Sequence, residues 1–204
     1  ANITTNKSYL TTEKHPTMSS PSPRKRFHKP CHLPNNIGKH FFEGLEAVFG
    51  DFHLHDFRET LNLWLHAALA SEQSAYANGG EREDLMDFVQ HLHRLTEAFC
   101  IIHAGTPAQQ SIPASTKGLL ANANRPFYLS EAEQGNPHQE IEQFRQAFRY
   151  SYAKAELMDL LEGVITYNGA KEIARADLVM FYRHLLYLVR LVYRMDERMI
   201  CEIA

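Results

Sequence analysis

The chain has 204 residues, 44% of them hydrophobic, which is enough for one globular domain with a tail. Residues 1–40 contain seven of the 21 Lys and Arg residues but one of the 24 acidic residues, so this segment carries about +6 and the remainder about −9. Three widely separated cysteines without a CxxC spacing argue against a disulfide framework or a zinc knuckle and favour a reducing compartment.

Residues 1–36 are predicted to form an extended basic arm. They are rich in Ser, Thr, Pro and Asn and have almost no periodic apolar positions, so little offsets the entropy cost of ordering them. They also lack the apolar stretch of a signal peptide, and we expect a cytoplasmic protein.

The arm contains the first candidate site for an anionic partner. A cationic cluster with one aromatic residue inside it consists of Arg24, Lys25, Arg26, Phe27 and Lys29. Short Lys/Arg clusters in flexible arms bind phosphate backbones by neutralising their charge, and the aromatic ring can stack on a base. The alternative is a tail that only increases solubility.

Residues 37–204 are predicted to form an all-α helical bundle. Apolar positions at helical spacing indicate a short helix over 37–49 and longer helices over 54–77 and 82–103. Because Asn78-Gly79-Gly80 is a strong turn signal, we expect the two longer helices to form an antiparallel hairpin.

The stretch 104–136 is predicted to be a long irregular crossover loop. It contains several Gly and Pro residues and no sustained period. Its apolar residues Phe127, Tyr128 and Leu129 are expected to anchor it against the helices.

A second long hairpin is expected from helices over 137–167 and 177–198, joined by a turn at Asn168-Gly169. The last helix is apolar over more than half of its circumference, so other helices must surround it. Arg183, His184 and Arg190 interrupt its apolar run, and we therefore expect no membrane span.

A narrow polar strip along this last helix is the second candidate site for an anionic partner. The strip consists of Arg183, Tyr187, Arg190, Arg194 and Arg198. Arginine suits this role because its planar guanidinium can bind a phosphate or a carboxylate at two points. The alternative is internal pairing with Glu142, Glu156 and Asp159 of the preceding helix.

The helix over 82–103 has polar residues beside its apolar face. His93 and Glu97 are expected at an edge of that face, as a solvated pair or, with His66, as a surface metal site across the hairpin. Cys100 also lies at an edge, without a neighbouring oxyanion hole. His103 is expected to be a packed core or capping histidine.

Four further side chains allow an alternative metal site, because they are expected on inner helix faces or flanks: Glu72, Glu162, Asp177 and His184. Carboxylates from several helices with a histidine are typical of di-metal bundles, but the Glu-x-x-His spacing of those sites is absent from every expected helix. The simpler interpretation is that these groups lie near helix ends in water or pair with Arg175 or Arg183. We expect no metal and no other cofactor.

These features predict a non-enzymatic helical assembly or accessory subunit of a larger complex. The bundle would bind a partner protein or its own copies, and the basic arm would bind an anionic partner such as nucleic acid. The competing hypothesis is a helical-bundle enzyme with a metal or cofactor at a carboxylate/histidine site. A third is a self-assembling structural protein without a nucleic-acid role.

Overall fold

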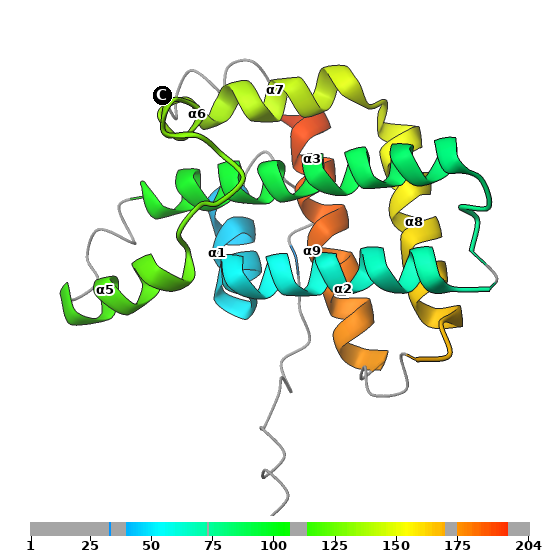
Figure 1. The fold of residues 1–204 in the computed structure, drawn as a ribbon. Coiled ribbons are helices and arrows are strands. Elements are labelled where there is room, and N and C mark those ends of the chain that lie inside the picture. The colour runs from blue at the N-terminus through cyan, green and yellow to red at the C-terminus, as the bar shows by residue number, and fades with distance from the viewer. Residues whose placement is uncertain (1–32, 34–39, 73, 107–113, 170–174, 196–204) are drawn as a thin grey trace, which may run out of the picture. The chain divides into compact units, whose positions relative to one another are not determined.

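The computed structural model describes residues 33, 40–72, 74–106, 114–169 and 175–195, and every regular element in these ranges is an α-helix, as predicted. The helices are α1 (Phe41–Asp51), α2 (Leu54–Ala70), α3 (Gly79–Ala104), α5 (Ala114–Ala123), α6 (Glu131–Gln134), α7 (Pro137–Ala147), α8 (Tyr150–Thr166) and α9 (Arg175–Arg194) (Figure 1). The chain divides into two compact units, residues 1–30 and 31–204, and all these helices belong to the second. The predicted arm lies outside the described residues, except for Leu33.

None of the described helices combines the length and the apolar character that a membrane crossing requires.

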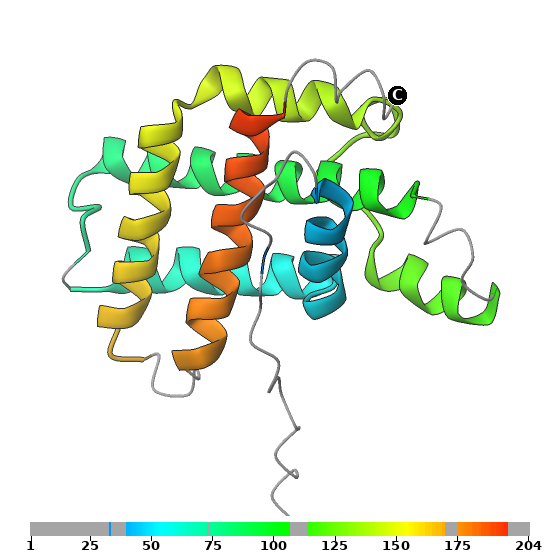
Figure 2. The same cartoon turned by 180° about the vertical axis from the view of Figure 1, so that it is seen from behind.

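The helices of the second unit pack as two layers that cross each other. α2 and α3 run side by side, and α8 and α9 run across them on the other side (Figures 1 and 2). Large rings fill the space between the layers. The ring centroid of Phe181 in α9 lies 5.1 Å from that of Trp64 and 5.3 Å from that of Phe57, both in α2. All three side chains are essentially inaccessible, and burying each contributes about 1.5–3 kcal/mol.

The start of α3 differs from the expected turn. Asn78 is the N-cap residue: its side chain accepts a hydrogen bond from the Glu81 N–H at 2.9 Å, and the Glu81 carboxylate accepts from the Asn78 N–H at 3.1 Å. Because this reciprocal capping box begins a helix, Gly79 and Gly80 are its first two residues and not part of a turn. The connection comes earlier, since α2 ends at Ala70 and not at Ala77.

The single helix predicted over 137–167 is wrong, because the chain breaks it at Phe148. This residue has extended backbone angles (φ −122°, ψ 142°), and its carbonyl accepts a hydrogen bond from the Tyr193 hydroxyl at 2.7 Å. Its ring packs edge-on against Phe88 at 5.2 Å. The break allows α7 to lie along α3 while α8 crosses onto α2 and α9, so each half buries its own apolar side.

The connection over 104–136 is not wholly irregular, because it contains α5 and the one-turn helix α6. Ser130 and Glu133 form a capping box that starts α6. Leu129 is buried as expected, and Tyr128 is half-buried. Phe127 does not anchor the segment with its side chain, which is 74% exposed.

Candidate functional site

The outer surface of α9 presents Arg183, Arg190 and Arg194, all exposed and all on the predicted strip. The rest of the helix circumference is covered, chiefly by α8 and α7. Within the described residues none of the three arginines forms an ion pair. The alternative of internal pairing is not seen: no ion pair of the described residues joins these arginines to Glu142, Glu156 or Asp159, and Glu142 instead pairs with Arg145 at 2.9 Å. Arg198 lies outside the described residues.

Tyr187 does not belong to this exposed strip, contrary to the prediction. It is 4% exposed and lies against α1, where a Cβ atom on Gly44 would overlap the tyrosine hydroxyl. Burial raises the pKa of Tyr187 to about 12, so its hydroxyl is neutral at physiological pH. The absence of a side chain at Gly44 is what allows α1 to cover this side of α9.

α8 adds a cation and an aromatic group beside the arginines. Tyr150, the first residue of α8, accepts a hydrogen bond from Arg190 Nε at 3.3 Å, and its ring packs edge-on against Tyr193 at 5.4 Å. Lys154 is exposed and follows Tyr150 by one helical turn, on the same side of α8. We call Lys154, Arg183, Arg190 and Arg194 the basic face.

The cationic cluster of the arm, Arg24 to Lys29, lies outside the described residues.

A buried carboxylate holds the segment before α6 against α3. Glu97 is fully buried, and its carboxylate accepts backbone hydrogen bonds from Phe127 at 2.7 Å, Tyr128 at 2.8 Å and Leu129 at 2.9 Å. Burial raises the pKa of Glu97, and these three donors oppose the rise. Figure 1 shows the connection from α5 to α6 passing across α3.

Arg94, on the same helix, extends this clamp to α6 and α7. Its guanidinium pairs with Glu133 and with Glu140, each at 2.6 Å, and donates to the Tyr128 carbonyl at 3.2 Å. The hydrogen bond from Arg94 is the main reason that the pKa of Glu133 falls to about 2. We call Arg94, Glu97, Glu133 and Glu140 the loop clamp.

His93 and Glu97 are buried, so the prediction that they lie at a solvated edge is wrong. The His93 ring stacks on Tyr128 with centroids 4.2 Å apart, and its Nε2 lies 3.2 Å from the Asn62 side-chain oxygen. Burial is the main cause that lowers the pKa of His93 to about 4, with the charge of Arg58 adding to the effect. His66, the proposed metal partner, is exposed and lies against Tyr167.

Cys100 and His103 are both buried near the C-terminal end of α3. Burial raises the pKa of the Cys100 thiol to about 12, which keeps it protonated and unreactive at neutral pH. The His103 ring stacks on Phe49 with centroids 5.6 Å apart, and the prediction of a packed core histidine is confirmed.

The four residues of the alternative metal site do not form one. Glu72 and Glu162 are exposed, contrary to their predicted inward orientation, because α2 ends before Glu72 and Glu162 lies on the outer side of α8. His184 is fully buried, with Nδ1 2.7 Å from the Met180 carbonyl and Nε2 3.1 Å from an Asp51 carboxylate oxygen. Asp177 is half-buried near the start of α9. In the described ranges, no three His, Cys, Asp or Glu side chains are grouped to hold a metal ion.

Sequence reasoning missed the loop clamp. The sequence placed Glu97 at an edge of the apolar face of α3, and it is buried because a segment 30 residues later covers that side. A usable signal was the apolar triplet Phe127-Tyr128-Leu129, which indicated that this segment packs on a helix but not on which one.

No protein-family model, no curated protein sequence and no solved structure matches this chain.

Proposed function

We propose that this chain is a non-enzymatic helical subunit that binds an anionic partner through the basic face, with nucleic-acid phosphates as the ligand. The observation on which this depends is the set of three exposed arginines on α9 that form no ion pair within the described residues. Guanidinium groups not engaged by carboxylates remain available to bind phosphate at two points.

The spacing of the basic face supports an extended ligand. At about 1.5 Å of rise per residue, Arg183 and Arg194 lie about 16 Å apart along α9, so they can contact several phosphates of one strand together. A helix that is packed on most of its circumference presents them with little backbone freedom.

The arm is the second element of the proposal. Residues 1–36 contain six basic residues and one acidic residue, and a flexible cationic segment adds binding energy that depends on charge and not on base sequence. We propose that the arm and the basic face bind the same polyanion, in a cytoplasmic complex with a partner protein or further copies of the chain.

For the scaffold we propose two antiparallel pairs, α2 with α3 and α8 with α9. The members of each pair follow one another among the described elements and pack against each other. In this arrangement the second pair is the rigid platform of the basic face.

The binding proposal is tested with the full chain and a labelled single-stranded oligonucleotide. Replacing Arg183, Arg190 and Arg194 together by Gln should weaken binding and reduce the slope of log K against log salt by about 2, the value for three phosphate contacts. Fluorescence anisotropy from 50 to 300 mM salt measures the slope, and circular dichroism verifies the fold.

Arg82→Gln is the matched control, because Arg82 is an exposed arginine at the start of α3. It should leave the slope almost unchanged. Binding that does not depend on salt, or equal slopes for the triple variant and the wild type, would show that the basic face is not the binding surface.

A further inference from the structure

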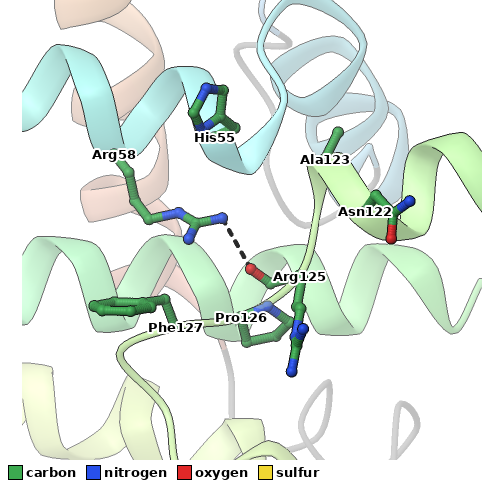
Figure 3. A pocket seen from close by; sticks show the side chains of 7 residues that line it. All are labelled: His55, Arg58, Asn122, Ala123, Arg125, Pro126 and Phe127. Carbon is green, nitrogen blue, oxygen red and sulfur yellow. Dashed lines mark hydrogen bonds between the residues drawn. The ribbon is translucent and has the colours of Figure 1, made fainter.

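A pocket of about 700 Å³ opens between the start of α2 and the segment from α5 to Phe127. Its lining residues are His55, Arg58, Asn122, Ala123, Arg125, Pro126 and Phe127 (Figure 3). This volume lies within the range of about 300–1,000 Å³ that is typical of small-molecule sites. The lining residues come from α2, the end of α5 and the segment that follows it, whereas the basic face lies on α8 and α9.

Arg58 lines this pocket from α2 (Figure 3). Its Nη2 donates to the Arg125 carbonyl at 2.9 Å, which fixes the guanidinium between His55 and Phe127 (Figure 3). Arg125 contributes a second cation, and its exposed side chain is not needed for that backbone hydrogen bond.

The described lining of the pocket contains no Asp or Glu. Outside the lining, Glu59 lies 3.1 Å from His55, and Glu97 accepts three backbone N–H groups and interacts electrostatically with Arg58. Two guanidinium groups without a lining carboxylate favour an anionic ligand.

Phe127 is the aromatic element of the pocket. Its side chain is 74% exposed, the highest value among the large hydrophobic residues of the described chain, yet its backbone N–H is bound to the buried Glu97 at 2.7 Å. A ring that remains in water on an anchored backbone is a preformed surface on which a planar group can stack.

We infer that this pocket binds a nucleoside phosphate, with Arg58 and Arg125 bound to the phosphate and the base stacked on Phe127. The inference concerns binding alone and does not depend on the proposed function of the basic face.

Isothermal titration calorimetry of the full chain with ADP tests this inference. We expect the wild-type chain to bind ADP saturably. The affinity for ADP should be about tenfold lower in Arg125→Gln, because this variant loses one charge-assisted contact. Phe127→Leu should also lower the affinity for ADP by about tenfold, because it removes the stacking surface while keeping an apolar side chain. Inorganic phosphate and adenosine should each bind more weakly than ADP.

Phe42→Leu and Arg82→Gln are the matched controls, since both alter exposed side chains outside the pocket, and they should bind ADP like the wild type. The triple α9 variant should do so as well, which separates this site from the basic face.

The absence of ADP binding at millimolar concentration, or wild-type affinity in both pocket variants, would overturn the inference. Equal affinity for ADP and inorganic phosphate would overturn the assignment to a nucleoside.

Discussion

At the scale of single residues, the polar groups of α3 determine how the connection before α7 is held. Glu97 binds three consecutive backbone N–H groups, and Arg94 joins Glu133 of α6 to Glu140 of α7. Removing one partner from a buried charged network leaves the other without compensation and is usually more costly than the net value of the interaction. The position of Phe127, and therefore the shape of the pocket, depends on this clamp.

His93 makes the stability of the fold sensitive to mild acid. In the unfolded chain the imidazole has its ordinary pKa of 6.5, whereas burial lowers its pKa in the native state to about 4. Between these values the unfolded state binds the extra proton, so stability decreases as the pH falls through this window. The loss attributable to His93 is about 3 kcal/mol.

Urea unfolding at pH 7 and pH 4 measures this effect. The free energy of unfolding should differ less between pH 7 and pH 4 in His93→Gln than in the wild type, by about 3 kcal/mol. His55→Gln, at an exposed position, should behave like the wild type. The buried His103 and the half-buried His138 contribute in the same direction, because desolvation lowers their pKa values too. An unchanged difference in His93→Gln would contradict the prediction.

At the scale of elements, the crossing of α2 and α8 depends on the absence of a side chain at Gly163. A Cβ atom there would lie 2.9 Å from both Cα and Cβ of Ala68, closer than real Cβ contacts. The two backbones approach closely at this point, and the layers meet there.

Gly163→Ala should therefore destabilise the protein by about 1–3 kcal/mol, because the overlap with backbone outweighs the gain in helix propensity. Gly50→Ala is the matched control: Gly50 lies in α1 with no neighbouring atom within 4 Å of a built Cβ, so its replacement should be neutral or slightly stabilising. Differential scanning calorimetry measures both variants. Equal melting temperatures for the two would mean that the layers separate easily at Gly163.

At the scale of the whole molecule, the chain consists of a helical unit, residues 31–204, and the preceding 30 residues. The buried core of the described chain runs from Phe41 to Met195, and Leu33 packs against it. We expect the helical unit to fold without residues 1–30.

Deletion of residues 1–30 should leave the free energy of unfolding, measured in urea, within about 0.5 kcal/mol of that of the full chain, as for changes away from a core. The same deletion should weaken oligonucleotide binding and reduce its salt dependence, because it removes six basic residues. A full-length chain with Gln at positions 24, 25, 26 and 29 separates charge from chain length. A lowered free energy of unfolding in the deletion variant would show that residues 1–30 stabilise the core. An unchanged dependence of binding on salt would show that these residues do not contact the oligonucleotide.

The sequence alone determined the all-helical character, the approximate positions of the main helices and the arginine strip on α9. These features are local, because a helix repeats every 3.6 residues and its apolar residues recur on one face regardless of what packs there. The apolar character of α9 also implied that other helices cover most of its circumference, and they do.

Only the tertiary structure decided which polar residues are buried and where the long helix breaks. His93 and Glu97 are buried by a segment about 30 residues later, and Tyr187 is buried by a glycine more than 140 residues earlier. Phe148 breaks the helix without Gly or Pro because its ring and carbonyl find partners on α3 and α9. Such outcomes depend on contacts between segments that are distant along the chain, which local periodicity does not encode.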